Sequence, residues 1–492
     1  MRRTMVIFFL CVGIALMTIS SVFAGGMGVM GVGAKASAMG GTFRAIADDW
    51  SAAYYNPAGL FYMTENELTV NEVISNYQLK YAPGINYGGY PVGFYQGEIY
   101  NRYEILTNPT LGGYFKLPVS GRDVVFGLAI FQPFDQNLSW ELFGSLNNSA
   151  SLPGQQIEHN FDAVAFNVVT AIELMENKLS FGLSGGLLKG DLIYGGFFLR
   201  DNPADPTASY YERVASRPND LITEWQHSDG NGLGFNLRSG LLFKPTEKLN
   251  LGLTYALPSS VTIDGDSYFY YYMPDNPYYR LDDDVLFPNS ANYILSYGAV
   301  YEAEGTFETE VKLPGQLAGG FAFQVNDKLL VTGDMEFTFW SDFKGYAFDY
   351  QFSDSGITFN DEINAWMVED MSLPVYWKNT LSGSLGLQYA YTEKIFLRAG
   401  YAADQSPFEV GTLHLAFFDS GLKHSATLGL GLVFENVRLD FSTKYTKYPE
   451  AIETGNVDLE DSNGNHDAVF DNLPGTYSGS ALESIAQFTV RF

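Results

Sequence analysis

This sequence of 492 residues has one cysteine and few charged residues. Its one cysteine, Cys11, lies in an apolar N-terminal stretch that we expect to be removed, which excludes disulfides, cysteine metal sites and lipid attachment through cysteine. Charged residues make up 17% of the chain, and Asp and Glu outnumber Lys and Arg by 56 to 28. With a net charge of −28 the protein lacks the basic surface that phosphate binding requires, so no nucleic acid partner is expected.

Long apolar runs are also missing. After residue 24 there is no stretch of 18 consecutive apolar residues, so we expect no membrane-spanning helix. The N-terminus has Arg2 and Arg3, then an apolar run over residues 5–19 and small or branched residues up to Ala24. This pattern predicts a secretory signal peptide over residues 1–24, cleaved after Ala24. A membrane anchor is the weaker alternative, because a spanning helix needs ~20 apolar residues.

Catalytic and metal-binding patterns are missing as well. The five histidines are scattered, and no Ser-His-Asp set or histidine metal spacing occurs, so we expect neither enzymatic activity nor a cofactor. Alternate positions in the run 461–467 carry possible calcium ligands, namely Asp461, Asn463, Asn465 and Asp467. The glycine does not stand where an EF-hand needs it, so a solvated loop is favoured and no metal site is predicted.

What the chain does have is alternation, most clearly at its C-terminus. One set of alternate residues is Leu482, Ala486, Phe488, Val490 and Phe492, and the other is Glu483, Gln487, Thr489 and Arg491. Successive side chains of a strand point to opposite faces, so this strand has an apolar and a polar face. A lipid-facing apolar side and a terminal aromatic residue are typical of the closing strand of an outer-membrane barrel. We expect contacts with outer-membrane lipid and lipopolysaccharide, and recognition of Phe492 by the barrel-assembly machinery.

Short turns and long loops also alternate along the chain. The short turns are at 120–123, 176–178, 245–248, 326–328, 392–394 and 435–437, and the long loops at roughly 81–107, 135–156, 195–230, 265–301, 345–373, 404–422 and 449–479. Six turns and seven loops predict an all-β fold, a fourteen-stranded antiparallel transmembrane β-barrel over residues 65–492, in the outer membrane. A soluble β-sandwich or propeller would not require short turns at one end and long loops at the other.

One expected strand is apolar on both faces. Residues 124–131 read Val-Val-Phe-Gly-Leu-Ala-Ile-Phe, and Pro133 follows closely. We predict that the set Val124, Phe126, Leu128 and Ile130 faces the lumen and, with Pro133, forms an apolar substrate path. Pro133 cannot donate a ladder hydrogen bond, so pairing should weaken there. Packing against an interior plug explains the same apolar face equally well.

Residues 25–64 precede the first strand and do not alternate. The segment begins with many glycines, continues through Asp48 and Asp49, which can cap a short helix, and reaches the turn dipeptide Asn56-Pro57. Such a compact, small-residue stretch can fold inside a barrel as a hatch.

This stretch resembles the FadL/TodX family of outer-membrane transport proteins. The resemblance rests on Ala47-Asp48-Asp49 and Asn56-Pro57-Ala58 at this spacing, and on two later blocks. These blocks run from Lys312-Leu313-Pro314-Gly315 through Trp340-Ser341, and from Trp377-Lys378 through Arg398-Ala399-Gly400-Tyr401 to Asp404-Gln405-Ser406-Pro407. The resemblance implies a fourteen-stranded barrel closed by an N-terminal hatch, with Asn56, Pro57 and Ala58 as the hatch motif.

The family also implies passive uptake of hydrophobic molecules, either long-chain fatty acids or aromatic hydrocarbons, which leave sideways into the bilayer beside a kinked third strand. The third strand here is 124–134. We favour long-chain fatty acids; uptake of aromatic or alkane hydrocarbons and a structural or adhesive barrel remain alternatives. Arg238 and Arg398 share parity with polar lumen residues and are candidate carboxylate contacts, although each could instead pair with interior acids such as Asp334 and Glu336.

Three further expectations concern the loop end. Leu138–Phe143 has the spacing of a short amphipathic helix. Trp340 and Trp377 fall where an interfacial aromatic girdle would lie. The stretch 264–284 is read as an acidic, tyrosine-rich loop that would repel anions, which favours a neutral ligand or a bound cation.

Overall fold

The computed structural model describes a large part of the chain. The described residues are 31–83, 98–102, 105–119, 121–143, 155–200, 222–273, 294, 298–352, 361–367, 370–408, 413–417, 419, 421–453 and 474–492. The predicted signal peptide and the run Asp461–Asp467 lie outside these residues.

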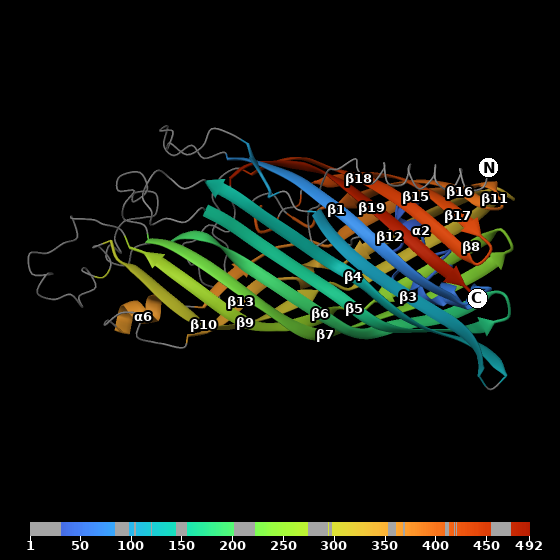
Figure 1. Ribbon diagram of the computed structural model, residues 1–492, viewed down its shortest axis with the longest axis horizontal. Coiled ribbons are helices and arrows are strands. Elements are labelled where there is room, and N and C mark those ends of the chain that lie inside the picture. The colour runs from blue at the N-terminus through green and yellow to red at the C-terminus, as the bar shows by residue number, and fades with distance from the viewer. Residues whose placement is uncertain are drawn as a thin grey trace, which may run out of the picture.

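The chain folds into a closed antiparallel β-barrel (Figure 1). The strands are β1 (Glu67–Pro83), β2 (Ile99–Tyr100), β3 (Ile105–Val119), β4 (Arg122–Phe143), β5 (Gln155–Met175), β6 (Leu179–Arg200), β7 (Ile222–Thr246), β8 (Leu249–Ala256), β9 (Ser259–Tyr272), β10 (Val300–Leu313), β11 (Gln316–Asn326), β12 (Leu329–Thr338), β13 (Gly345–Phe352), β14 (Met371–Pro374), β15 (Thr380–Thr392), β16 (Ile395–Gln405), β17 (Leu422–Phe434), β18 (Val437–Glu453) and β19 (Gly475–Arg491). The pairs β8/β9, β10/β11, β12/β13 and β14/β15 are each one wall strand with a short interruption, and β2 is a two-residue addition. The wall therefore has the predicted fourteen strands.

The barrel closes between its first and last strands. β1 pairs with β19 without a register shift from Glu67 opposite Arg491 to Pro83 opposite Gly475. The predicted short turns join β3 to β4, β5 to β6, β7 to β8, β11 to β12, β15 to β16 and β17 to β18. They lie at the end of the barrel that carries the C-terminus (Figure 1), which we call the turn end.

Alternation decides which face of each strand meets lipid. Large apolar side chains point outward and remain exposed, as Leu233, Phe235 and Leu428 do. On β19 the parity is as predicted: Phe488 is exposed, whereas Gln487 and Thr489 are buried inside. An apolar outer face and a polar inner face are what a wall between lipid and lumen requires.

Helices are short and few among the described residues. They are α2 (Ala34–Ser37), α3 (Ala52–Tyr55), η1 (Pro57–Tyr62), η4 (Trp340–Asp342) and α6 (Asp361–Met367). No helix within the described ranges is both long enough and apolar enough to cross a membrane.

The structure corrects the three loop-end expectations. Leu138–Phe143 is part of β4 rather than a helix. Of the stretch 264–284, residues 264–272 belong to β9, so their acids and tyrosines stand on a strand and not in a loop, whereas residues 274–284 lie outside the described residues. Trp340 and Trp377 are buried and pack edge-to-face, with ring centroids 5.1 Å apart, instead of forming an interfacial girdle. The first two stretches follow the period of two that a strand requires, and the two tryptophans point into the barrel.

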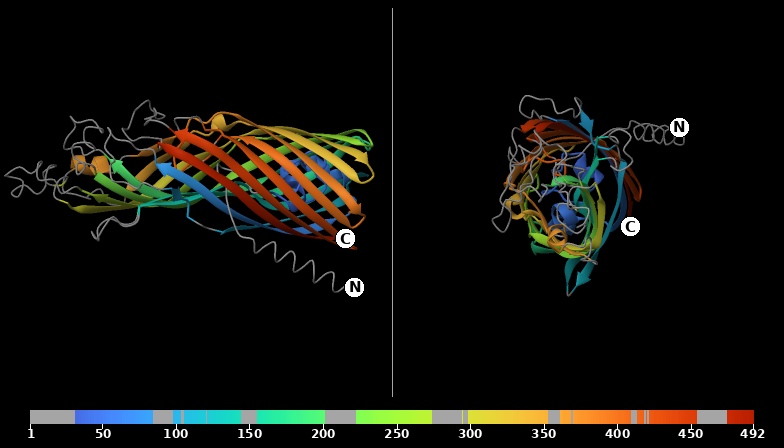
Figure 2. Two further views of the ribbon diagram at one scale, coloured as in Figure 1. Left: turned by 90° about the horizontal axis from the view of Figure 1, so that it is seen from above. Right: turned by 90° about the vertical axis from the view of Figure 1, so that its left-hand side faces the viewer.

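Residues 31–64, here called the N-terminal segment, lie inside the barrel near the turn end (Figure 2, right). Hydrogen bonds tie the segment to strands around the wall: Ala34 N to Gln487 Oε1 (3.0 Å), Phe43 N to Asp334 Oδ2 (3.0 Å), Trp50 N to Glu67 Oε1 (3.1 Å), Asn56 Nδ2 to the carbonyl of Leu241 (3.0 Å) and Ser180 Oγ to the carbonyl of Ala58 (2.8 Å). These bonds reach β1, β6, β7, β12 and β19, so the segment crosses the lumen rather than leaning on one side.

Two wall glycines allow this close approach. A Cβ atom at Gly182 would lie 2.4 Å from the backbone nitrogen of Ala58, and one at Gly240 would lie 2.0 Å from Oδ1 of Asn56. Any larger residue at these positions must displace the segment, because both distances are well inside van der Waals contact.

Gly182→Val tests this seat. The added methyl groups should overpack the contact with η1 and cost ~1–3 kcal/mol, which should lower the melting temperature in detergent. They should also raise maleimide labelling of a cysteine introduced at Ala58, which is fully buried in the native protein. Gly383→Val is the matched control, since a Cβ at Gly383 would meet nothing within 4 Å. Equal melting and labelling in the two variants would contradict the close approach.

Candidate functional site

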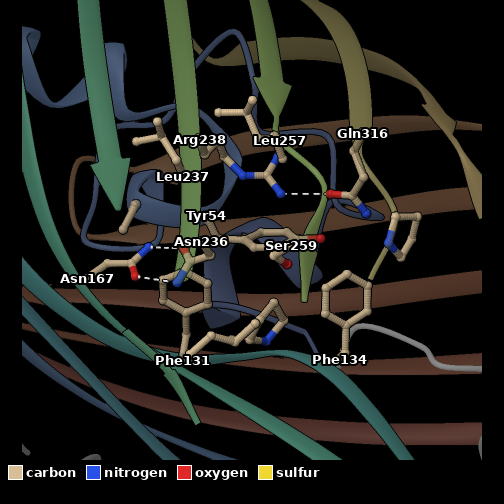
Figure 3. A pocket seen from close by; sticks show the side chains of 15 residues that line it. Tyr54, Phe131, Phe134, Asn167, Asn236, Leu237, Arg238, Leu257, Ser259 and Gln316 are labelled. Carbon is tan, nitrogen blue, oxygen red and sulfur yellow. Dashed lines mark hydrogen bonds between the residues drawn. The ribbon is translucent and has the colours of Figure 1, made fainter. Parts of the chain in front are cut away.

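A cavity lies between the N-terminal segment and the wall (Figure 3). It has an empty volume of about 460 Å³, part of it open to solvent. Its lining residues are Ala53, Tyr54, Phe131, Pro133, Phe134, Asn167, Leu188, Asn236, Leu237, Arg238, Ala256, Leu257, Ser259, Pro314 and Gln316. We call this space the inner cavity. Apolar and aromatic walls with a few polar groups are typical of sites for small apolar ligands.

A bulge in β4 forms one wall of the inner cavity. Phe131 pairs with Ala165 and Phe134 pairs with Ala163, so β4 carries one residue more than β5 between these two pairs. Pro133 is one of the two β4 residues in this bulge, and it has no backbone N–H to donate. The predicted weak pairing at Pro133 is therefore present, and the bulge directs Phe131 and Phe134 into the cavity.

The hydrogen-bond ladder between β3 and β4 stops at the same level. It runs from Val119 opposite Arg122 to Leu111 opposite Ile130 and goes no further. Above this point β3 pairs with β1 alone and β4 pairs with β5 alone. In the described part of the chain, which omits residues 103 and 104, backbone contact with β4 resumes where Asn101 lies opposite Trp140 and Arg102 donates to the carbonyl of Ser139 at 2.6 Å. The wall thus has a ladder interruption next to the inner cavity.

Side chains span this interruption. The Tyr77 hydroxyl, on β1, donates to Oδ2 of Asp135 on β4 at 2.8 Å. Asp135 and Asp162 are directly opposite each other across β4 and β5. Gln132 donates to both carboxylates, at 3.2 and 2.7 Å, and Asn137 does the same at 2.5 and 3.2 Å. The bond from Tyr77 thus joins β1 to β4 beside the interruption, while Gln132 and Asn137 hold Asp135 against β5. These side-chain bonds can open without unfolding a strand.

The predicted lumen-facing set of this strand is wrong. Phe126 and Leu128 are exposed and face lipid, together with the half-buried Val124 and Ile130. The inward set is the other parity, of which Val125, Ala129 and Phe131 are buried. Because both faces are apolar, alternation along the strand could not show which one is inside. Pro133 does line the inner cavity.

Arg238 on β7 points into the inner cavity (Figure 3). Its Nη2 donates to Oε1 of Gln316 at 2.7 Å, and its guanidinium carbon lies 4.7 Å from the ring centroid of Tyr54. Burial raises the pKa of the Tyr54 phenol to about 12, so this ring is uncharged. Among the described residues Nη1 has no hydrogen-bond partner and no carboxylate lies within ion-pairing distance of Arg238. A buried cation without a counter-ion is costly, which makes it a strong anchor for an anion.

The interior acids expected near Arg238 are used by another residue. Arg44 of the N-terminal segment donates to Asp334 at 3.2 Å and to Glu336. Sequence reasoning did not single out Arg44, because nothing local predicts that it faces β12.

Arg398 has its own counter-ion. It donates from Nη1 to Asp440 at 2.7 Å, and neither side chain is exposed to solvent. Arg438 donates to the same carboxylate at 2.6 Å. Arg398 and Arg438 thus share one carboxylate inside the wall, whereas Arg238 has no carboxylate partner among the described residues.

The hatch motif lies beside the inner cavity. Asn56 donates from Nδ2 to the carbonyls of Arg44 and Leu241, at 2.7 and 3.0 Å, and accepts from the backbone of Ala58 at 3.1 Å. Pro57 begins η1. One amide group therefore joins two parts of the N-terminal segment to each other and to β7.

Other lining residues had no signal in the sequence. Asn167 and Asn236 donate to each other's side chains, at 2.8 and 2.9 Å, at one side of the cavity (left in Figure 3). They come from β5 and β7, which are brought together only by the barrel register. In the described part of the chain, no group of three or more His, Cys, Asp or Glu is arranged to hold a metal ion.

Comparison with known proteins agrees with this architecture. The model of the family described as outer membrane protein transport protein (OMPP1/FadL/TodX) matches residues 15–492. A putative outer membrane protein of Neisseria meningitidis serogroup B is 23% identical over 475 residues, which is 92% of this chain and 93% of that protein.

Two solved structures share the fold. The P. putida toluene transporter TodX has a TM-score of 0.68 at 17% identity, with 94% of this chain and 99% of that one covered. A FadL homologue of Pseudomonas aeruginosa has a TM-score of 0.65 at 17% identity, with 96% and 99% covered. The chain is an outer-membrane protein and belongs to the FadL/TodX family of transport proteins for hydrophobic compounds.

Proposed function

We propose that this protein is a passive channel for long-chain fatty acids, whose carboxylate binds at Arg238. The observation that carries the proposal is the buried Arg238 guanidinium, which faces an apolar cavity and has no carboxylate partner among the described residues. A fatty acid supplies both missing parts, an anion for the cation and an alkyl chain for Phe131, Phe134 and Leu188. Charge-assisted bonds to a carboxylate are about twice as strong as neutral ones.

The route out of the inner cavity is proposed to be lateral. The bulge at Pro133 lines the cavity, and the ladder between β3 and β4 ends at Ile130 beside it. Outside this point the wall presents Leu111 and Leu128 to lipid. An apolar molecule that passes here enters the bilayer directly and never meets bulk water, which is the favourable path for it.

Gating is proposed to lie in the N-terminal segment. Asn56 is the residue through which η1 and the stretch around Arg44 are held to β7. Movement of this amide would change the lining at Ala53 and Tyr54, which belong to the same segment.

Hydrocarbons are the second candidate substrates. The P. putida relative is described as a toluene transporter, and an aromatic hydrocarbon could pack on Tyr54, Phe131 and Phe134. Such a ligand would leave Arg238 without an anion, so the two substrate classes differ in their dependence on this residue.

Arg238→Met should separate the two substrate classes. A charge-assisted hydrogen bond contributes ~1.5–3 kcal/mol, so the affinity for labelled oleate should fall roughly 10- to 150-fold. Labelled toluene should bind as before, because methionine keeps the apolar contacts. Binding is measured on the purified protein in detergent. Arg238→Lys keeps the charge and should recover most of the oleate affinity. An equal loss for both ligands, or no loss for oleate, would contradict the proposed anchor.

Deletion of Pro133 tests the lateral route. Losing one residue restores equal spacing between β4 and β5 and should straighten the bulge, so oleate uptake should drop to the level of a host without the channel. Deletion of Pro449 is the matched control, because it removes the same kind of one-residue bulge between β18 and β19. Both variants are checked for insertion by heat-modifiable gel mobility. Normal uptake after the Pro133 deletion would rule out release beside the bulge.

Asn56→Ala tests the gate. The substitution removes two donated hydrogen bonds from the seat of the N-terminal segment and should change the rate of oleate uptake while the barrel still inserts. Asn71→Ala is the control, since Asn71 is equally buried but donates to Thr110 on β3. Uptake rates identical to those of the unmodified protein in both variants would remove Asn56 from the gating mechanism.

A further inference from the structure

The inner cavity has a second polar feature besides Arg238, namely the side-chain amides of Asn167 and Asn236, here called the amide pair. Each amide donates from Nδ2 to Oδ1 of the other, at 2.8 and 2.9 Å. Both residues line the cavity, and Asn167 is buried. The amide pair lies on the left in Figure 3, and the bond between Arg238 and Gln316 lies farther to the right.

The register of the barrel brings the amide pair together. Asn167 of β5 and Asn236 of β7 both lie opposite Gly186 of β6. Glycine has no side chain, so the two amides can meet across the intervening strand. The amide pair therefore lies over β6, on one side of β7.

The guanidinium group lies on the other side of β7. Arg238 and Gln316 of β11 both lie opposite Ala256 of β8, and they meet across that strand. Arg238 also follows Asn236 by two residues on β7. Neighbouring strands are ~4.8 Å apart and two residues of a strand span ~7 Å, so the amide pair and the guanidinium are on the order of 10 Å apart.

The amide pair can offer a ligand an acceptor but not a free donor. Nδ2 of Asn167 donates to Asn236 and to Oγ of Ser184 at 3.0 Å, which uses both of its hydrogens. Nδ2 of Asn236 donates to Asn167 and is also directed at the carbonyl of Gly186 at 3.4 Å. Each Oδ1 accepts one hydrogen bond among the described residues, whereas an amide oxygen has two lone pairs. A ligand group that binds here must therefore donate, as a hydroxyl does and a ketone or an ether does not.

We propose that the inner cavity selects a long-chain carboxylate with a hydroxyl group in the middle of its chain. The inference rests on the proposed binding of the carboxylate at Arg238 and specifies the substrate class of the same site. The hydroxyl donates to an Oδ1 of the amide pair, and the chain between the two polar ends lies along the apolar lining. Three bonds of an extended chain span ~3.8 Å, so a separation of ~10 Å corresponds to roughly eight bonds and places the hydroxyl near roughly carbon 10.

Polar side chains continue along the proposed lateral route. Asn76 of β1 and Gln136 of β4 are buried, and neither amide has a hydrogen-bond partner among the described residues. They are the sequence neighbours of Tyr77 and Asp135, which are bonded to each other beside the ladder interruption. A buried amide without a partner is costly. A hydroxyl that passes here can bond to these amides, whereas an unsubstituted alkyl chain cannot.

Two matched ligands test the need for a donor. The acids 10-hydroxyoctadecanoate and 10-oxooctadecanoate carry oxygen at the same carbon, but only the hydroxy acid can donate from it. Binding is measured by displacement of labelled oleate from the purified protein in detergent. The hydroxy acid should bind at least about fivefold more tightly, because the ketone oxygen would be buried against amide oxygens without a partner.

A double variant tests the amide pair itself. Asn167→Leu with Asn236→Leu replaces both partners by apolar groups of similar size, a change that can be nearly neutral for stability. The preference for the hydroxy acid over the oxo acid should vanish in this variant. The affinities for octadecanoate and for 2-hydroxyoctadecanoate, whose hydroxyl stays beside the carboxylate, should not change.

Asn71→Leu is the matched control, and it should keep the preference for the hydroxy acid. Asn71 is also a buried amide, but it donates to Thr110 on β3 and does not line the inner cavity. Insertion of each variant is checked by heat-modifiable gel mobility. If the double variant does not insert, the comparison of the two ligands on the unmodified protein still decides.

Two results would overturn the inference. One is equal binding of 10-hydroxyoctadecanoate and 10-oxooctadecanoate to the unmodified protein, and the other is a preference that survives in the double leucine variant. Failure of the carboxylate anchor has a different signature. Arg238→Met should weaken both acids by the same factor and leave their ratio unchanged. Undiminished binding of both acids in Arg238→Met would refute the anchor and, with it, the position assigned to the hydroxyl.

Discussion

The need to pair every backbone polar group inside a bilayer governs this structure. A lipid-facing strand edge has no water to bond, so the wall must close on itself, and β1 and β19 do so along their full length. The β3–β4 ladder is an exception to this constraint, because it ends at Ile130. Beside this point the Tyr77 side chain of β1 bonds to Asp135 of β4, and a side-chain bond can exchange partners more easily than a strand can. At this point in the described wall, a side-chain bond takes the place that backbone pairing has between β1 and β19.

Charge inside the barrel follows a similar rule. Arg44 is balanced by Asp334 and Glu336, and Arg398 by Asp440, so these ions serve the seating of the N-terminal segment and the rigidity of the wall. Arg238 is different, because its described partners are the neutral groups of Gln316 and Tyr54. Among the described residues, the interior thus combines arginines that already bind a carboxylate with Arg238, which binds none. That distinction depends on partner geometry and not on residue type.

The sequence was sufficient for the architecture and insufficient for the site, and the residues show why. Period-two alternation and the turn spacing lead to fourteen strands, because lipid and lumen impose opposite polarity on neighbouring positions. Where both faces are apolar, as in 124–131, that signal vanishes and the wrong parity was assigned to Phe126 and Leu128. The partners of Arg238 and Arg398 depend on register between strands remote in sequence, which no local pattern encodes. The prediction of a helix over Leu138–Phe143 is wrong for a related reason. A short stretch with one buried side fits both the 3.6-residue period of a helix and the two-residue period of a strand.

The hydrogen bonds of the N-terminal segment also have a consequence for biogenesis. Gly31 and Ala34 donate to Glu483 and Gln487 of the last strand, and Trp50 donates to Glu67 of the first. The binding surface for the beginning of the chain, which also includes β6, β7 and β12, is therefore complete only when the last strand is in the wall. Seating of the segment must follow barrel closure, and a seated segment is a marker that the seam between β1 and β19 has formed correctly. An open or misregistered intermediate would lack the bonds to Glu67, Glu483 and Gln487 and would hold the segment by β6, β7 and β12 alone among the contacts described above.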